Sequence, residues 1–217
     1  MNIAIPLSLE RSDIRNYFIN EAYLKFIRNA GYFPIPITPY QQMPDCDGLL
    51  LPGGIDIDPI YYGYDNRYSK HIDSNRDKFE RNLLHYFISK KKPIYGICRG
   101  FQLIFLEFCK KYPNNSFSYT QHIDGHNQNE LKLERSNTSH FVKFKDSSKA
   151  VNSLHHQACL IKTNASSKRL IPIATTTRNS PQGYKIIEAF KIPEWNVKAV
   201  QWHPEEMDDI WMGFTES

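Results

Sequence analysis

The segment from residue 93 to residue 102, which reads PIYGICRGFQ, constrains the fold of this chain more than any other part of the sequence. A short apolar run typical of a buried strand ends at Ile97, and a helical pattern begins directly after Cys98. Gly96 and Gly100 flank the cysteine at two residues' distance, where a tight turn leaves no room for a Cβ atom. This strand–turn–helix arrangement predicts an α/β fold that presents Cys98 as a nucleophile.

Short apolar runs alternate with stretches of helical period through the first half of the chain. The strand candidates are residues 2–7, 32–38, 48–51 and 94–97, and the helix candidates are residues 17–30, 79–92 and 101–108. Prolines interrupt the second strand candidate, so it suits the edge of a sheet. The alternation predicts a central, mostly parallel sheet flanked by helices on both faces. We expect one domain that spans residues 1–217.

The second half of the chain has a different pattern. Residues 113–140 are polar and have no clear period, so we expect a long surface loop, either a lid or a binding loop over the site. After this loop, strands are expected at residues 141–144, 170–175, 184–190 and 197–202. Whether the loop closes over the site cannot be predicted from its composition.

Composition narrows the classes of function and the cellular location. Among 217 residues the formal net charge is +4, and the basic residues are scattered, which argues against a nucleic-acid surface and suits an anionic substrate. The first residues lack the pattern of a signal peptide, and no apolar run approaches the length of a membrane span. We therefore expect a cytoplasmic protein with reduced cysteines and no membrane partner.

The expected turn also favours chemistry at Cys98. A cysteine at the N-terminus of a helix feels the positive end of the helix dipole, which favours the thiolate. The backbone N–H of Arg99 would point toward an oxyanion formed at this position. Gln102 lies one helical turn further on and could face the same pocket. The other three cysteines (Cys46, Cys109 and Cys159) lack the glycine frame and are expected to be structural.

A second motif, VQWHPE, ends a predicted strand and supplies a base. His203 and Glu205 are two residues apart, so in extended geometry both side chains project to the same side. A carboxylate there can accept a hydrogen bond from one imidazole nitrogen and leave the other nitrogen for a thiol. Combined with the cysteine turn, this motif predicts a Cys98–His203–Glu205 catalytic triad.

Other motifs could line the pocket. Leu51 is followed by Pro52, Gly53 and Gly54, and this glycine pair offers N–H groups near the carboxyl edge of the sheet. Arg76 stands in the sequence DSNRDKFE at the start of a helix and could bind a substrate carboxylate.

The string VNSLHHQ places His155 beside a second histidine. Neighbours on a strand point to opposite faces and no third ligand is evident, so we expect no metal here, and no cofactor. A contact between His155 and the substrate is the alternative that this polar strand end favours.

These pieces, in this order, resemble the class I glutamine amidotransferases, a flavodoxin-like fold with a nucleophile elbow. The GICRGFQ turn, the VNSLHHQ string, the RDKFE helix start and the final QWHPE look like their stand-alone hydrolase branch, peptidase family C26, which includes γ-glutamyl-γ-aminobutyrate hydrolase. The resemblance covers nearly the whole chain. It implies thiolate attack by Cys98 on a γ-glutamyl carbonyl, with His203 as base and acid and Glu205 as its orienter.

The resemblance also implies roles for the pocket residues. The N–H groups of Gly54 and Arg99 would hold the oxyanion, and the glutamyl pocket would be lined by a set of four residues, Gly53, Arg76, Gln102 and His155. A narrower resemblance, to the γ-glutamyl-CDP-amidate hydrolase of capsular phosphoramidate synthesis, implies a nucleotide conjugate as the small-molecule substrate. The chain lacks the Gly-Gly turn that commonly follows the nucleophile helix in this branch, so we expect the leaving-group half of the pocket to be specialised.

Two alternatives remain open at this stage. An amidotransferase subunit that passes ammonia to a partner synthetase would use the same chemistry at Cys98. A binding or redox-sensing domain on the same fold would modify Cys98 without turnover, although the intact pair of His203 and Glu205 argues against it.

Overall fold

A computed structural model shows an α/β domain built on one large mixed sheet; it describes all residues except 10–15, 40, 43, 128–133 and 208–217. Five strands run parallel in the order β4, β1, β5, β6 and β13. Their bounds are Phe33–Ile37, Asn2–Pro6, Gly48–Leu51, Ile94–Ile97 and Val197–Val200. Numbered by their sequence, the order is 2-1-3-4-5, that of flavodoxin-like folds. The expected fold class is confirmed.

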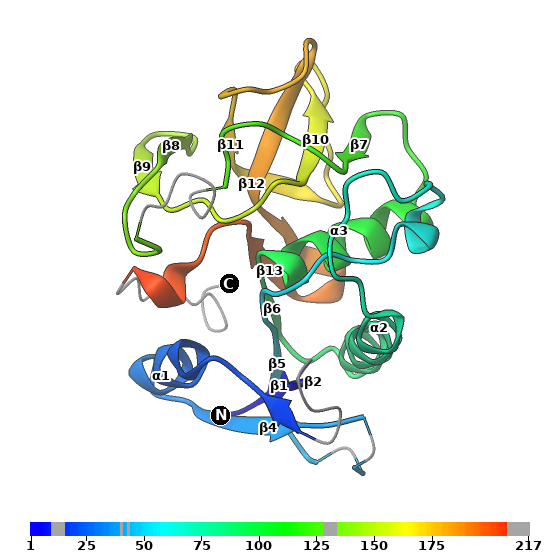
Figure 1. The fold of residues 1–217 in the computed structure, drawn as a ribbon, viewed down its shortest axis with the longest axis vertical. Coiled ribbons are helices and arrows are strands. Elements are labelled where there is room, and N and C mark those ends of the chain that lie inside the picture. Colours follow the sequence, from blue (N-terminus) through cyan, green and yellow to red (C-terminus); the bar gives the residue numbers. More distant parts are fainter. Residues whose placement is uncertain (10–15, 40, 43, 128–133, 208–217) are drawn as a thin grey trace.

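Helices cover both faces of this parallel region, as Figure 1 shows. The helix α1 (Glu21–Asn29) lies on one face, and α2 (Ser74–Ser89) and α3 (Arg99–Lys111) lie on the other. Side chains along each strand alternate between two separate apolar cores. In β5, Leu50 packs with the residues of α1, while Leu49 and Leu51 pack with those of α2 and α3. This period of two explains why the parallel strands are apolar throughout.

The sheet continues as antiparallel strands beyond β13, in the upper part of Figure 1. The order there is β12 (Tyr184–Ile192), β11 (Ile171–Thr176), β8 (His140–Lys143) and β9 (Ser148–Val151). Off this path, β10 (Ala158–Lys162) pairs with both β12 and β7 (Phe117–Thr120). A separate hairpin of β2 (Ser8–Leu9) and β3 (Tyr17–Phe18) stands beside the parallel region.

The local signals behind the helix starts are visible in the structure. The side chain of Asn20 accepts a hydrogen bond from the backbone of α1, and that of Asp73 accepts two from the first turn of α2. These caps satisfy N–H groups that a helix leaves free at its start. Helix α1 therefore begins four residues later than the apolar periodicity indicated, and helix α2 begins five residues earlier.

Three expectations need correction. The segment at Tyr17 and Phe18 forms the strand β3 rather than helix, because its two residues pair with β2 and α1 starts only after the cap Asn20. The region expected as a loop over residues 113–140 contains the strand β7, whose alternating burial over only four residues is too short a pattern to read. The strands β9 and β10 were not expected either. The lid hypothesis involves residues 128–133, which lie outside the described residues.

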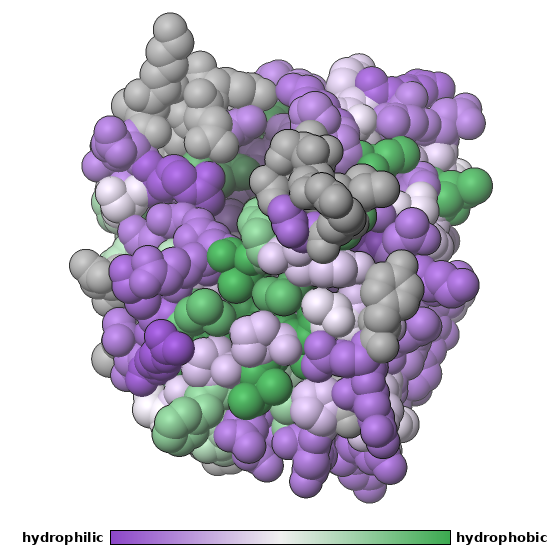
Figure 2. Space-filling model, turned by 60° about the horizontal axis from the view of Figure 1, so that its bottom comes forward, coloured by the Kyte–Doolittle hydropathy of each residue, from purple (hydrophilic) through white to green (hydrophobic). Residues whose placement is uncertain are grey.

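The surface is not uniformly polar. On the face that Figure 2 shows, apolar side chains gather near the centre and hydrophilic ones surround them. Within the described part of the chain, no helix is both long and apolar enough to cross a membrane.

Candidate active site

Cys98 occupies a strained turn between β6 and α3. Its backbone has φ 50° and ψ −101°, a conformation that a residue with a side chain rarely adopts. The N–H of Cys98 donates to the carbonyl of Val200 at 2.8 Å, and its carbonyl accepts from Gln102 at 3.0 Å. Strand β13 and helix α3 therefore hold the turn from both sides.

The two glycines that frame Cys98 are required by packing. A Cβ atom at Gly100 would come 2.7 Å from the Cβ of Leu51 and even nearer its carbonyl oxygen. At Gly96 a Cβ would come 2.6 Å from the side chain of Ile104. Strand β5 and helix α3 can thus approach the turn only where a side chain is missing. The prediction that this turn leaves no room for a Cβ atom at either glycine is confirmed.

His203 and Glu205 lie beside this turn, at the end of β13. The imidazole Nδ1 of His203 lies 2.6 Å from a carboxylate oxygen of Glu205, and both side chains are buried. The Cys98 side chain lies on the same side of the loop as this imidazole, because both border the Cα of Gly53. Burial alone would lower the pKa of His203, but the charges of Glu205 and Cys98 outweigh it and raise this pKa to about 10. The imidazole therefore carries a proton at neutral pH.

The local geometry of this pair differs from the expected one. Residues Pro204–Glu206 form a single 3-10 turn instead of continuing the strand. The two side chains meet because the turn brings Glu205 back toward His203, and not because they alternate along an extended backbone. The proline explains the difference, since it cannot extend the sheet and suits the first position of a helical turn.

Asn152 fixes the backbone of His203. Its side-chain oxygen accepts from the N–H of His203 at 2.8 Å, and its Nδ2 donates to the carbonyl of His203 at 3.0 Å. Both partners are buried. The segment that contains this asparagine, VNSLHHQ, therefore positions the imidazole although it lies far from His203 in the sequence.

The glycine pair after β5 lies against the same residues. A Cβ atom at Gly53 would come 2.8 Å from the imidazole of His203 and 3.4 Å from the Cβ of Cys98. The N–H of Gly53 donates to the hydroxyl of Tyr23 at 2.9 Å. Gly54 has φ 148°, which favours glycine, and the guanidinium of Arg76 packs against its Cα. The loop thus borders both the imidazole and the thiol.

A buried ion network, which sequence reasoning missed, connects this loop to the nucleophile turn. Arg76 donates from Nη2 to the carbonyl of Gly53 at 2.8 Å and from Nε to Glu80 at 2.6 Å. The side chain of Arg99 pairs with both Glu80 and Asp77, and all four charged side chains are buried. The spacing of Arg76 and Glu80 along α2 was the only available signal, and it resembles an ordinary surface pair.

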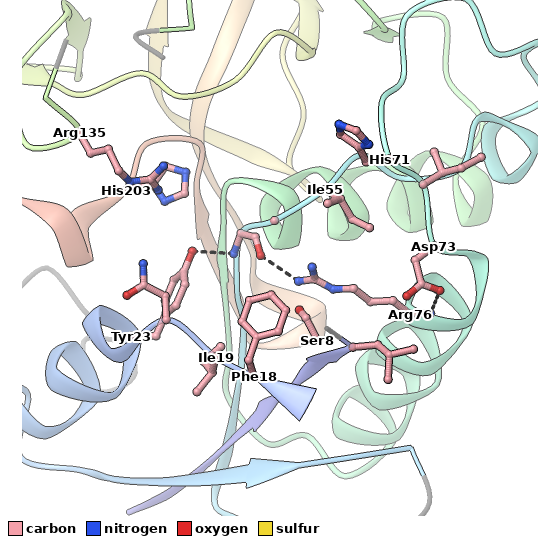
Figure 3. A pocket seen from close by; sticks show the side chains of 15 residues that line it. Ser8, Phe18, Ile19, Tyr23, Ile55, His71, Asp73, Arg76, Arg135 and His203 are labelled. Atoms are coloured by element: carbon pink, nitrogen blue, oxygen red, sulfur yellow. Dashed lines mark hydrogen bonds between the residues drawn. The ribbon is translucent and has the colours of Figure 1, made fainter. Parts of the chain in front are cut away.

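A cavity of about 600 Å³ opens in front of the glycine loop. Figure 3 shows Tyr23, His203 and Arg76 around it, together with Phe18 from the β2–β3 hairpin and Arg135. Its wall combines apolar side chains with charged and polar ones. The apolar set is Leu9, Phe18, Ile19, Ile55 and Ile72, and the other set includes His71, Asp73, Arg76, Arg135 and His203. Such a cavity suits a small anionic molecule with an apolar part.

Four of the expected substrate-binding and oxyanion residues border this region, and two lie elsewhere. Gly53, Gly54 and Arg76 line the cavity. Gln102 is buried behind it, where its Nε2 donates to Gln201 at 3.1 Å. His155 is buried near Glu188. Together with His126, these two residues form a group that could bind a metal ion. The backbone of Arg99 belongs to the nucleophile turn itself.

The other three thiols differ from Cys98 in their surroundings. Burial raises the pKa of Cys46 and of Cys159, and it raises that of Cys109 to about 12. These thiols therefore stay protonated at neutral pH. Their placement agrees with the structural role expected for them.

Comparisons with known proteins point in one direction. The family model for peptidase C26 matches residues 6–205. The chain is 31% identical over 200 residues to the glutamine amidotransferase-like protein YvdE of Lactococcus lactis, covering 87% of this chain and 80% of that protein. It is 27% identical over 209 residues to the gamma-glutamyl-gamma-aminobutyrate hydrolase PuuD of Escherichia coli, covering 86% and 78%.

A solved structure has the same fold. The glutaminase domain of CTPS from Trypanosoma brucei, with bound acivicin, matches with a TM-score of 0.56 over 94% of this chain and 86% of that one. The sequence identity in this match is 15%, so it supports the fold alone.

Proposed function

The chain belongs to the peptidase C26 family, and we propose that it hydrolyses a γ-glutamyl amide bond with Cys98 as the nucleophile. The observation that carries this proposal is that Cys98 and His203 border the same glycine, Gly53, while the His203 imidazole pairs with Glu205 at 2.6 Å. A cysteine activated by a histidine, which a carboxylate orients, is the arrangement used for acyl transfer on several folds.

The proposed reaction has two steps. With its proton on His203, the Cys98 thiolate attacks the γ-carbonyl carbon, and the carbon–nitrogen bond breaks as His203 gives that proton to the leaving amine. A γ-glutamyl thioester on Cys98 remains. A water molecule then loses a proton to His203 and attacks the thioester, so that glutamate leaves and the thiol is restored.

The oxyanion of each tetrahedral intermediate would be held by backbone N–H groups. We assign this role to Gly54 and Arg99, which lie on the two loops that meet at Cys98. The buried ion network of Arg76, Glu80 and Arg99 supports the assignment, because it ties these two loops together.

Recognition of the glutamyl group falls to residues on the cavity side of the thiol. Gly53 and Arg76 line the cavity, and Arg76 brings a positive charge that suits a substrate carboxylate. Gln102 and His155 remain predictions that rest on the family pattern, and both would act from behind the cavity wall.

For the leaving group we propose a cytidine diphosphate joined to the glutamine side chain. Hydrolysis would yield glutamate and cytidine diphosphoramidate, a step in capsule polysaccharide modification in the cytoplasm. Arg135 on the cavity wall supports this choice, because a guanidinium suits a diphosphate, and the His71 imidazole on the same wall offers a hydrogen-bond donor. Phe18, 52% exposed at the same cavity, offers a surface for the base.

A substrate panel tests both levels of the proposal. The purified protein is assayed for glutamate release from glutamine, γ-glutamyl-γ-aminobutyrate and γ-glutamyl-CDP-amidate. We expect the nucleotide conjugate to have the highest kcat/KM. A higher kcat/KM for γ-glutamyl-γ-aminobutyrate would contradict the proposed cytidine diphosphate leaving group but not γ-glutamyl hydrolysis itself. Glutaminase activity that arises solely with a partner synthetase would contradict the hydrolase itself.

A further inference from the structure

Three histidines surround one buried carboxylate in the antiparallel half of the sheet, away from the nucleophile turn. Glu188 lies on β12, and its Oε1 is 3.8 Å from Nδ1 of His126, 3.9 Å from Nε2 of His155 and 3.2 Å from Nε2 of His140. The four side chains are 0–2% exposed. His126, His155 and Glu188 each offer one ligand atom, and these three atoms lie within 4.8 Å of one another.

Backbone carbonyls fix the orientation of two of these rings. Nε2 of His126 lies 3.1 Å from the carbonyl of Arg178, and Nδ1 of His155 lies 2.8 Å from the carbonyl of Gln157. A carbonyl only accepts, so each of these nitrogens carries the ring's proton. The opposite nitrogens, Nδ1 of His126 and Nε2 of His155, then carry lone pairs and lie 3.8 and 3.9 Å from Glu188. Nδ1 of His126 also lies 3.4 Å from the hydroxyl of Ser153, whose proton goes to the carbonyl of His126 at 2.6 Å.

Nδ1 of His126, Nε2 of His155 and the Glu188 carboxylate are therefore three hydrogen-bond acceptors that lie close together. Nε2 of His155 and Oε2 of Glu188 have no hydrogen-bond partner among the described residues. Buried polar atoms are normally paired, and an unpaired one carries a large desolvation cost. A cation at the centre would satisfy the carboxylate and both lone pairs together.

We propose that His126, His155 and Glu188 bind a zinc ion. Two neutral imidazoles and a carboxylate are a zinc ligand set, and the carbonyls behind both rings are the outer partners that zinc-binding histidines use. Zinc bonds of about 2.0–2.1 Å in a tetrahedron place ligand atoms about 3.4 Å apart. The three ligand atoms now lie up to 4.8 Å apart, so their separations would have to shrink by up to about 1.4 Å. This assignment replaces the substrate contact expected for His155, and it uses none of Cys98, His203 and Glu205.

His140 and a water molecule would complete the surroundings of the ion. The ring of His140 is within hydrogen-bond distance of Glu188 and orients the carboxylate. The water takes the fourth position that three protein ligands leave. Burial supports neutral imidazoles as ligands, since it lowers the pKa of His126 and lowers that of His155 to about 3.

The ion would clamp segments that the chain brings together from far apart. It would join β12 to the loop that carries His126 and to the VNSLHHQ segment that carries His155. That segment also contains Asn152, which holds the backbone of His203. Zinc would therefore stabilise the part of the fold that supports the imidazole.

Metal content of the protein tests the proposal directly. Protein made without a metal-affinity tag is refolded with Zn²⁺ or with a chelator, passed over a desalting column and measured by elemental mass spectrometry. We expect about one zinc per chain after zinc refolding and a Tm several degrees above that of the chelated sample. Co²⁺ in place of zinc should give the visible absorption of a tetrahedral site. A zinc content below about one tenth per chain, with no shift in Tm, would overturn the site and leave protons to satisfy the cluster.

Variants locate the ion. His155→Asn and Glu188→Gln are expected to lose the zinc and the cobalt spectrum. The matched control is His156→Asn, because this neighbour points away from the cluster to Asp56 at 2.9 Å. All variants are also made with Cys98→Ser, so that zinc bound by the Cys98 thiolate does not add to the measured zinc content. Equal zinc in His155→Asn and His156→Asn would also overturn the proposal.

Discussion

Nδ1 of His203 lies 2.6 Å from Oε1 of Glu205. Only Pro204 separates the two residues in the chain, and it begins the 3-10 turn that brings them together. A carboxylate so placed holds the proton on Nδ1 and leaves the other ring nitrogen for the proposed exchange of a proton with Cys98. Because the pair is buried, its electrostatic interaction is stronger than it would be in water. The geometry of one short turn thus sets both the orientation and the charge of the imidazole.

Replacing Glu205 by Gln removes the charge and keeps the shape. Since the carboxylate raises the pKa of His203, the imidazole of the variant should lose its proton at a lower pH. We expect kcat to fall about 100-fold or more, as with removal of the orienting carboxylate in a triad, and the alkaline limb of the pH profile to move down. The pH dependence of kcat/KM is the measurement.

Glu206→Gln is the matched control for that variant. Glu206 pairs with Arg135 at 3.0 Å and faces away from the imidazole. Its profile should keep the wild-type alkaline limb. A common shift in both variants would mean that general surface charge, and not contact with His203, sets the pKa.

The stability of the fold should depend on pH through His203. Its pKa is about 10 in the folded state, above the ordinary value near 6.5 of an unfolded chain. The folded state therefore binds the proton more tightly, and this contribution is complete below about pH 6.5 and lost as the pH rises through about 10. Urea unfolding of wild type and His203→Gln measures it: the difference in unfolding free energy should shrink from pH 6.5 to pH 10. A constant difference would contradict the raised pKa.

Gly100→Ala should damage both packing and chemistry. The added Cβ would come 2.7 Å from the Cβ of Leu51 and nearer still to its carbonyl, so strand β5 or the turn must move. We expect a loss of about 1–3 kcal/mol in unfolding free energy and a fall in kcat. Gly183→Ala is the comparison, because its φ is 83° but no atom lies within 4 Å of the new Cβ. Equal losses would show that the close approach to β5 is unimportant.

Arg99→Met tests the buried ion network. It leaves Asp77 and Glu80 buried with less compensating charge, which should cost about 3–5 kcal/mol in unfolding free energy. The exposed pair of Lys25 and Glu21 is the contrast, and Lys25→Met should change that energy by at most about 1 kcal/mol. Chemical denaturation gives both values. A small effect at Arg99 would mean that the network does not join the two loops firmly.

The placement of Cys98, His203 and Glu205 near one another was easier to predict from the sequence than the fold around them, and their catalytic role stays a prediction. Cys98 lies between two glycines in a pattern set by local sterics, and the parallel strands are short apolar runs with helices between them. Both signals are local. The partner of His203 was predicted for the wrong geometric reason, because a proline can end a strand or start a helical turn.

What the sequence could not show depends on contacts between distant segments. The four-residue strand β7 pairs with β10, about forty residues later, and its own sequence carries too few alternations to indicate a strand. Likewise Glu188 gives no local sign of the histidines around it, which come from three other segments. The role of Asn152 in holding His203 also spans fifty-one positions.

The most direct test of the account is the proposed thioester on Cys98. The protein is mixed with a turned-over γ-glutamyl substrate, quenched in acid within one turnover, digested and analysed by peptide mass spectrometry. The account predicts a glutamyl group on the Cys98 peptide, its absence after treatment with hydroxylamine, and a loss of glutamate release by at least about 1000-fold in Cys98→Ala. Undiminished hydrolysis by Cys98→Ala, or a glutamyl group on another residue, would contradict it.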